Sequence, residues 1–332
     1  MKLFVTGATG FLGDWVVREA LSAGHAVRAL IRPNAQPELP EGAESAPASL
    51  LDADALLGAI EGCDAVIHLA GRVSRAKRDA PEMHEVHVEG TRALLSAMSR
   101  AGIRRLVLAS TSGTIGLRQD KLSSPATEDE VPDFELLGKF PYYTSKLYQE
   151  QEVLRRRASG DIDPIILNPS LLLGPGDRRL SSTSDVLEIL NRRVPAVSDG
   201  TMALVDVRDV APMFVRALEA GRVGERYLLN GANMSVKTFV QRVGVAGDVM
   251  GPTLKVSNKW AVRGAKLVSG LFESLDRDPP LDPVAVEMST LHWDVDASRA
   301  RQDLGFEARD PQSTIEATVR DLENRGLFRR SR

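Results

Sequence analysis

The sequence predicts an α/β fold: a doubly wound parallel sheet with a smaller C-terminal cap. Short apolar segments alternate with amphipathic helical segments through residue 170, and this rhythm is typical of βαβ units with parallel strands. After residue 174 the alternation weakens and short strands mix with helical segments. We therefore expect a first domain over 1–173, whose sheet is completed by parts of 200–232, and a substrate-binding cap formed mostly by 174–332.

Glycines mark the ends of two predicted helices. Glycine readily adopts the left-handed conformation that ends a helix. The two helices are Asp14–Ala23, ended by Gly24, and Gly90–Ala101, ended by Gly102. The stretch 34–49, rich in Pro, Glu and Ala, is expected to be a surface excursion. The expected strands are Leu3–Val5, Ala26–Ile31, Ala65–Leu69, Arg105–Ala109 and Pro164–Leu167, with Ala203–Val207 and Arg226–Leu229 in the second half.

Composition argues against several classes of protein. Charged residues make up 26% of the 332 residues and the formal net charge is −3, so no strong field attracts nucleic acid or a membrane surface. The single Cys63 excludes an internal disulfide and a cysteine-based metal cluster. No apolar run is long enough to span a bilayer, and the N-terminus lacks the features of a signal peptide. We expect a cytoplasmic protein that binds neither nucleic acid nor a metal.

The segment 258–275 carries apolar residues at helical spacing. A helix packed on a core or on a dimer partner explains this pattern better than a membrane-surface helix, because basic residues on the segment are few.

The first strand runs into a glycine-rich turn, Thr6-Gly-Ala-Thr-Gly-Phe-Leu-Gly13. Its glycines recur every third residue and let the backbone approach a pyrophosphate, while a helix beginning near Phe11 directs its N–H groups at the phosphates. The spacing differs from G-x-G-x-x-G by one inserted residue, and a turn that merely reverses the chain is the alternative. The pattern predicts a dinucleotide-binding Rossmann domain, with cofactor contacts from Gly7, Thr9, Gly10, Phe11, Leu12 and Gly13.

The residue after the second strand indicates which dinucleotide binds. A carboxylate there accepts a hydrogen bond from the ribose of NAD, but this strand is followed by Arg32, whose planar guanidinium suits a 2′-phosphate. We expect NADP(H); the alternative is that Arg32 is a solvated charge. Arg28 is the weaker phosphate candidate, because it lies further from the mouth of the sheet. By position in the fold, the adenine is expected near Leu51 and Asp52, and the rest of the cofactor beside Leu69, Ala70 and Gly71.

A tyrosine and a lysine lie at the start of a helix, in Pro141-Tyr-Tyr-Thr-Ser-Lys146. Proline suits the first helical position, and Tyr142 and Lys146, four residues apart, share one face. An adjacent ammonium lowers the pKa of a phenol, so Tyr142 is a candidate general acid or base; an ordinary exposed helix start is the alternative. The pair follows the hydroxyl-rich loop Ser110–Gly116 by one βα step. A hydroxyl of this loop is expected to orient a substrate carbonyl for hydride transfer.

Together, the glycine turn, the segment His68–Gly71, the hydroxyl-rich loop and the tyrosine–lysine pair resemble an extended short-chain dehydrogenase/reductase over nearly the whole chain. The resemblance implies that Thr111 orients the substrate, with Ser112 as the fallback. It also implies that Tyr142 is the general acid/base and that Lys146 binds the nicotinamide ribose. Pro169 and Ser170 correspond to the family segment beside the nicotinamide, and a homodimer is the usual assembly.

Three further residues are compared with the family pattern. Tyr143 is the competing phenol, disfavoured because only Tyr142 has the family spacing to Lys146. His87 stands where the family usually has an asparagine that supports a proton relay. We expect both His87 and His68 to be packed, hydrogen-bonded histidines rather than catalysts. For His87 the alternative is that it replaces the family asparagine as a hydrogen-bond donor.

The resemblance is strongest to dihydroflavonol-reductase-like and hydroxysteroid-dehydrogenase-like members, which implies reduction of a ketone or aldehyde by NADPH. Ser112-Gly113 replaces the Asp-Glu pair of a dehydratase and argues against that branch. A nucleotide-sugar epimerase is the chief alternative and a non-catalytic NADP(H)-binding sensor the second. Apolar residues in the loops and cap agree with a hydrophobic carbonyl substrate and equally with core packing. The candidate diphosphate ligands of an epimerase are Arg178, Arg179, Arg192 and Arg193.

Overall fold

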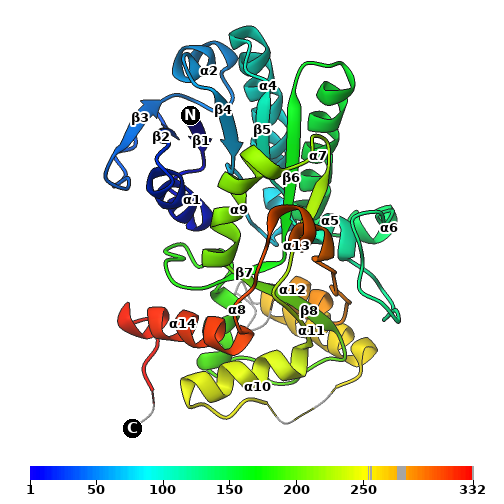
Figure 1. The fold of residues 1–332 in the computed structure, drawn as a ribbon. Coiled ribbons are helices and arrows are strands. Elements are labelled where there is room, and N and C mark those ends of the chain that lie inside the picture. The colour runs from blue at the N-terminus through cyan, green and yellow to red at the C-terminus, as the bar shows by residue number, and fades with distance from the viewer. Residues whose placement is uncertain (253, 255, 275–281, 331–332) are drawn as a thin grey trace.

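The computed structural model describes residues 1–252, 254, 256–274 and 282–330, and confirms the α/β prediction (Figure 1). The larger sheet has seven parallel strands in the order β3-β2-β1-β4-β5-β6-β9. The order reverses direction on either side of β1, as in a doubly wound sheet. Its strands are β1 (Lys2–Thr6), β2 (Ala26–Ile31), β3 (Ala43–Pro47), β4 (Ala65–His68), β5 (Arg105–Ala109), β6 (Asp163–Pro169) and β9 (Arg226–Leu229).

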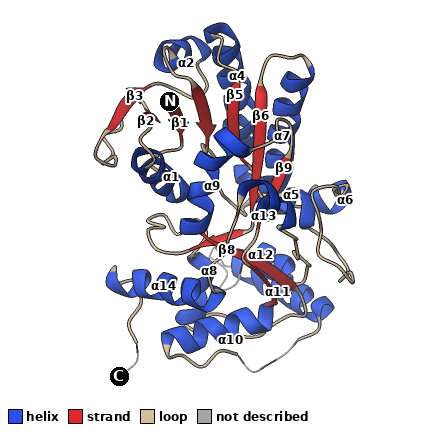
Figure 2. Cartoon of the chain, viewed as in Figure 1, coloured by secondary structure: helices blue, strands red, loops and turns tan. Residues whose placement is uncertain are grey.

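Alternate side chains of this sheet enter two separate apolar cores. In β1, for example, Leu3 and Val5 enter one core and Phe4 enters the other, as the two-residue period of a strand requires. The sheet is therefore covered by helices on both faces (Figure 2). The first core is completed by α1 (Phe11–Ser22), α9 (Val207–Ala220) and α13 (Ser298–Leu304), and the second by α2 (Ala53–Ile60), α4 (Gly90–Ala101) and α7 (Pro141–Ala158).

A second sheet begins two residues after β6 and has the order β10-β8-β7. It consists of β7 (Leu171–Leu173), β8 (Thr201–Asp206) and β10 (Ala232–Ser235). Because it follows the carboxyl end of β6 directly, its lobe lies at that edge of the main sheet (Figure 1). The helices of this lobe are α8 (Ser184–Leu190), α10 (Val236–Gly247), α11 (Asn258–Ser274), α12 (Pro283–Ser289) and α14 (Pro311–Asn324).

One expectation about local structure needs correction. The prediction that all of 34–49 is a surface excursion is wrong, because Ala43–Pro47 pairs with β2 as the edge strand β3. The predicted strand at 203–207 is observed as β8 in the small sheet, and the predicted strand at 226–229 is β9 in the main sheet. The predicted helix over 258–275 is observed as α11, and Leu275 lies outside the described residues. None of the described helices is both long and apolar enough to cross a bilayer.

The helix that precedes β5 contains one wide turn. It runs from α3 (Ala80–His84) through η2 (Glu85–Glu89) into α4, and Gly90 N donates to Glu85 O, five residues back instead of four. Such π turns accommodate one extra residue, and this one contains the buried His87. The remaining short elements are η1 (Lys77–Asp79), α5 (Gly113–Gly116) and α6 (Phe134–Leu137).

Candidate active site

The glycine-rich turn closes against the end of β4. Gly7 has a φ of +70°, and a Cβ built on it would lie 2.6 Å from Ala70 N. A Cβ on Gly13 would lie 2.0 Å from Gly7 O. Thr6 Oγ1 accepts hydrogen bonds from Leu69 N at 3.2 Å and from Ala70 N at 3.1 Å. Both glycines are therefore required by backbone packing, and the turn is held rigidly beside the 69–70 segment.

Among the described residues, no side chain caps the N-terminus of α1. Gly10 occupies the capping position, and the helix begins at Phe11, as predicted. Thr9 and Gly71 are exposed, while Phe11 and Leu12 are half-buried. The first N–H groups of a helix need acceptors from outside it. The helix therefore begins with N–H groups that no side chain caps, next to glycines at which a Cβ would clash with the backbone. This arrangement fits the pyrophosphate of a dinucleotide.

The residues predicted near adenosine have different surroundings. Arg32 directly follows β2 and is exposed, but Arg28 pairs with Glu44 at 3.3 Å and donates to Ala59 O at 3.1 Å. Arg28 is thus committed to structural contacts. Exposed Leu51 precedes Asp52, whose Oδ1 accepts from the first N–H groups of α2 at 3.0 Å. The Asp52 carboxylate therefore caps a helix.

The helix with the predicted tyrosine and lysine is tied to the end of β5. Lys146 Nζ donates to Ala109 O at 2.6 Å, and it also donates to Gln149 Oε1. Thr111 lies two residues beyond Ala109, and its Oγ1 accepts from Gly113 N at 3.3 Å. Since that contact uses the oxygen as an acceptor, the Thr111 hydroxyl hydrogen is available to another group.

Aromatic rings surround Tyr142 at the start of α7. Its ring makes edge contacts with His87 at 5.8 Å and with Tyr143 at 5.1 Å between centroids. Burial raises the pKa of Tyr142 to about 12, which is opposite to the lowering that the sequence predicted. The physical reason is that the hydrogen bonds of Lys146 go to Ala109 and Gln149, so desolvation dominates at the phenol.

Burial also acts on the charged and titratable groups around this helix. It lowers the pKa of Lys146 to about 7, against the opposing effect of the Glu150 charge. Burial, and to a lesser degree the nearby Lys146, lower the pKa of His68 to about 3. His68 lies between Thr6 Oγ1 at 2.6 Å and Thr91 Oγ1 at 2.9 Å. His68 is therefore a neutral, hydrogen-bonded core histidine, as predicted.

His87 uses both ring nitrogens. Nε2 accepts from Arg72 N at 3.0 Å, so the ring hydrogen is on Nδ1, which lies 2.8 Å from Ser145 Oγ. Ser145 Oγ in turn donates to Tyr142 O at 2.8 Å. Burial and, to a lesser degree, Lys146 lower the pKa of His87 to about 2. This histidine is uncharged and fully bonded, in agreement with the structural role predicted for it.

Tyr143 belongs to an apolar wall beside the loop. Its ring lies 5.1 Å from that of Trp293, and a Cβ on Gly113 would lie 2.3 Å from Tyr143 Cε1. Val284 and Met288 of α12 are partly buried in the same cluster. Two other apolar residues, Phe134 and Trp260, are instead 58% and 68% exposed. Glycine at 113 is therefore required to seat the tyrosine ring.

Several charged residues of the second half form ion pairs. Asp206 pairs with Arg208 at 2.6 Å, and Asp209 pairs with Arg309 at 2.7 Å. Arg193, a candidate diphosphate ligand, pairs with Glu188 at 3.0 Å. The other three candidate arginines are exposed; they are Arg178, Arg179 and Arg192.

A bidentate ion pair joins the two lobes. Arg75, in the loop after β4, donates to both carboxylate oxygens of Asp185 on α8, with Nη1 2.8 Å from Oδ1.

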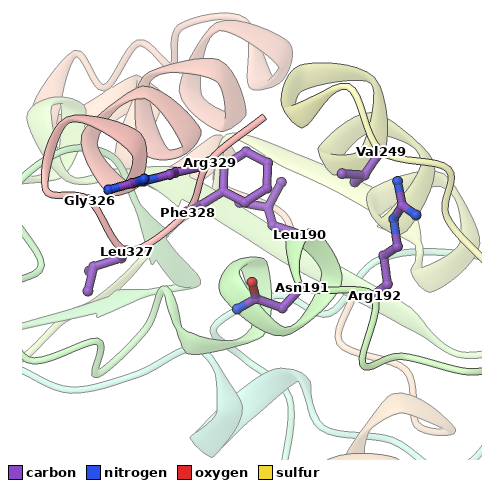
Figure 3. Close-up of a pocket in the computed structure, with 8 residues that line it drawn as sticks. All are labelled: Leu190, Asn191, Arg192, Val249, Gly326, Leu327, Phe328 and Arg329. Carbon is purple, nitrogen blue, oxygen red and sulfur yellow. The ribbon is translucent and has the colours of Figure 1, made fainter. Parts of the chain in front are cut away.

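An open pocket in the small lobe lies apart from these residues. Figure 3 shows Leu190, Asn191 and Arg192 facing Val249 and the C-terminal segment 326–329. None of the predicted cofactor or catalytic residues lines this pocket.

Comparison with known proteins identifies the family. A model of the NAD-dependent epimerase/dehydratase family matches residues 3–229. The chain belongs to this family. Its predicted resemblance to extended short-chain dehydrogenases/reductases is thereby confirmed, and its cofactor class is a nicotinamide dinucleotide.

Three known proteins are similar to almost the whole chain. A Synechocystis protein provisionally named dihydroflavonol 4-reductase is 32% identical over 96% of this chain and 92% of that protein. The 2-alkyl-3-oxoalkanoate reductase of Stenotrophomonas maltophilia is 31% identical over 97% of this chain and 98% of that enzyme. The crystal structure of gox2253 is 29% identical, covers 98% of this chain and 99% of that one, and has a TM-score of 0.83.

Two buried polar residues of this family member were not predicted as part of the site. Gln149 accepts from Lys146 and donates from Nε2 to Thr91 Oγ1 at 2.8 Å, and Glu150 is buried next to it. They follow Lys146 by three and four residues, so they lie on the same side of α7. That spacing was the available signal, because polar residues in a helix are otherwise expected to face solvent.

Proposed function

We propose that this member of the family is an NADPH-dependent reductase that converts a ketone or aldehyde to an alcohol. The supporting observation is the hydrogen bond from Lys146 Nζ to Ala109 O. It ties the helix that carries Tyr142 in its first turn to the strand that leads into Thr111, at the carboxyl edge of the sheet. Ligands of open α/β sheets bind at this edge.

In the proposed reaction, two residues act on the substrate carbonyl. The Thr111 hydroxyl donates a hydrogen bond to the carbonyl oxygen, and Tyr142 Oη delivers the proton that this oxygen needs as the carbon is reduced. A phenol with a pKa near 12 is protonated at neutral pH, which suits a proton donor. Solvent then reprotonates the phenolate, and Lys146, charged below about pH 7, binds the nicotinamide ribose.

The cofactor residues divide by the part of NADPH that each would hold. NADPH, when bound, supplies the hydride that reduces the carbonyl carbon. The exposed Arg32 is the proposed partner of the 2′-phosphate. The pyrophosphate falls to Gly7, Thr9, Gly10, Phe11, Leu12 and Gly13. Leu51 and Asp52 lie on the adenine side, and Lys146, Leu69, Ala70, Gly71, Pro169 and Ser170 on the nicotinamide side.

The relatives and the apolar wall support a carbonyl substrate with a hydrophobic part. Two of the three proteins named above are reductases by name. Tyr143 and Trp293 lie next to Gly113, and together with Val284 and Met288 they offer partly buried apolar surface. We also expect a cytoplasmic homodimer; light scattering coupled to size exclusion measures the assembly.

A nucleotide-sugar epimerase is the alternative within the family. Of its candidate diphosphate ligands, Arg178, Arg179 and Arg192 are exposed on the second lobe. A dehydratase is disfavoured by the packing at Gly113, where the side chain of a glutamate would meet the Tyr143 ring. A non-catalytic NADP(H)-binding sensor is the third possibility that the assay must distinguish.

The test is NADPH oxidation, followed optically with a panel of ketones and aldehydes. Tyr142→Phe is expected to lower turnover by at least about 100-fold, because only the proton donor is lost, while NADPH binding measured by fluorescence stays nearly unchanged. Tyr148→Phe, on the exposed side of the same helix, is the matched control. Full turnover by Tyr142→Phe would refute the assignment. Epimerisation of a nucleotide sugar without carbonyl reduction supports the alternative, and cofactor binding with neither activity supports the sensor.

A further inference from the structure

Helix α7 buries a second charged side chain that the proposed mechanism leaves unused. Glu150 lies one turn after Lys146 and is only 1% exposed. Burying a carboxylate is costly unless hydrogen bonds and opposite charges compensate it. The groups around Glu150 therefore indicate what it does.

One oxygen of Glu150 accepts three hydrogen bonds from the surroundings of Thr111. Oε1 accepts from Thr114 Oγ1 at 2.8 Å, from Asn168 Nδ2 at 2.8 Å, and from Ser110 Oγ. Ser110 and Thr114 lie on either side of Thr111 in the loop after β5, and Asn168 belongs to β6. The carboxylate thus links α7 to both neighbouring strands.

Two of these donors also reach the main chain of Thr111. Asn168 Nδ2 donates to Thr111 O at 3.1 Å, and Thr114 Oγ1 lies 2.8 Å from the same oxygen. Because an amide group has two hydrogens, Asn168 can bridge Glu150 and Thr111 at the same time. The position of Thr111 therefore depends on the carboxylate of Glu150 through at least one intermediate side chain.

The charge of Glu150 acts on Lys146 as well. Burial lowers the pKa of Lys146 to about 7, and the negative charge of Glu150 opposes this effect. Glu150 Oε2 lies 3.8 Å from Arg226 Nη1 on β9. Among the residues that the structure describes, the other titratable groups near Lys146 are His68 on β4, His87 in η2 and Tyr142 on α7 itself, all uncharged at neutral pH. Glu150 is therefore the carboxylate that supports the buried ammonium.

We propose that Glu150 is a positioning residue for the reaction: its hydrogen bonds fix the Thr111 loop, and its negative charge, one helical turn away, favours the ammonium form of Lys146. The expected effects of Glu150 on kinetics rest on the proposed reductase function. The effect of Glu150 on Lys146 does not rest on that function, because the protonation of Lys146 is measured without turnover. One carboxylate then couples the two elements that carry the catalytic groups.

The charge is tested with Glu150→Gln, which keeps an acceptor oxygen and removes the negative charge. The protonation of Lys146 is followed by NMR of lysine ¹³Cε and ¹⁵Nζ nuclei in the full chain, and the signal is assigned by its loss in Lys146→Met. The midpoint is expected to fall by about one pH unit. Glu152→Gln, which disturbs surface ion pairs with Arg92 and Arg155 on the same helix, is expected to leave it unchanged. An unchanged midpoint in Glu150→Gln would overturn the coupling.

The hydrogen bonds are tested with Glu150→Ala at pH 6. The expected result is a 10- to 100-fold lower kcat, in the range that lost positioning costs, with the KM for NADPH within about twofold of the wild-type value, because the loop and not the cofactor turn is displaced. Ser110→Ala removes one of the three donors and should show a smaller loss of the same kind, also if Glu150→Ala does not fold.

Wild-type kcat in both variants, or a loss confined to the KM for NADPH, overturns the positioning role. If the wild-type protein itself reduces no carbonyl, the proposed function fails, and the NMR titration still decides whether Glu150 supports Lys146.

Discussion

The buried ammonium of Lys146 gives a quantitative prediction about stability. Its pKa is about 7 in the folded protein and 10.5 in the reference state, and each unit of difference corresponds to about 1.4 kcal/mol. Holding the charge inside therefore costs the folded state about 5 kcal/mol at pH values below 7. Between pH 7 and 10.5 the unfolded chain binds the extra proton, so the stability of the folded protein rises with pH in this window.

The perturbation is Lys146→Met, which removes the charge and keeps a long unbranched side chain. The free energy of unfolding of both proteins is measured by urea denaturation, without cofactor, from pH 6 to 9.5. The difference between wild type and variant should change by about 1.4 kcal/mol per pH unit above pH 7, in favour of the wild type, and be flat below it. The variant also loses the hydrogen bonds that Lys146 donates to Ala109 and Gln149. This loss shifts the difference in unfolding free energy by a constant and leaves its slope with pH unchanged.

Other titrating groups do not imitate this slope. Protonation of His68 and His87 makes the free energy of unfolding depend on pH only below their reference pKa of 6.5. Ionisation of Tyr142 does so only above pH 10, because its pKa is raised. In both proteins these contributions lie outside the window from pH 7 to 9.5 in which the slope is measured. A difference that is flat across pH 7 to 9.5 would refute the claim that Lys146 carries a strongly lowered pKa.

Two further predictions concern the cofactor. Arg32→Asp should shift the ratio of kcat/KM for NADPH over NADH by at least about tenfold toward NADH, because a carboxylate repels a 2′-phosphate and accepts a hydrogen bond from a free hydroxyl; an unchanged ratio would remove Arg32 from the site. Gly13→Ala should weaken NADPH binding and lower the thermal midpoint of unfolding, because its Cβ would lie 2.0 Å from Gly7 O. The control is Gly24→Ala, since a Cβ at Gly24 meets nothing within 4 Å. This variant should bind NADPH normally and lose only the stability that an alanine at positive φ costs. Equal NADPH affinities in these two variants, measured by fluorescence titration, would contradict the close approach inferred at Gly13.

The main sheet was predictable because its strands are short apolar runs separated by helices of clear period. The edge strand β3 was not, since Ala43–Pro47 contains Glu, Ser and Pro and buries only Ala46. An edge strand pairs through its backbone on one side and needs few apolar side chains. The second sheet was also out of reach of local patterns, because β8 pairs with segments about 30 residues away on either side.

The candidate site was predictable only where a motif spans a few residues. The glycine turn and the spacing of Tyr142 and Lys146 are local, whereas the pKa of each group depends on what buries it. Spacing alone suggested that Lys146 lowers the phenol pKa, but the lysine on helix α7 donates its hydrogen bond to Ala109 at the end of strand β5. Contacts such as the one between Glu150 and Asn168 join separate elements, and nothing in either local sequence specifies them.

The wide turn at Glu85–Glu89 means that the long segment from Ala80 to Ala101 is two helices joined out of phase. Deleting one residue there would restore a regular helix, shorten it by about 1.5 Å and rotate its N-terminal half by about 100° relative to α4. His87 would then swing away from Ser145, while α4 stayed seated on its sheet face. One inserted residue thus changes the direction of the side chains that contact Tyr142, while the core behind α4 keeps its packing.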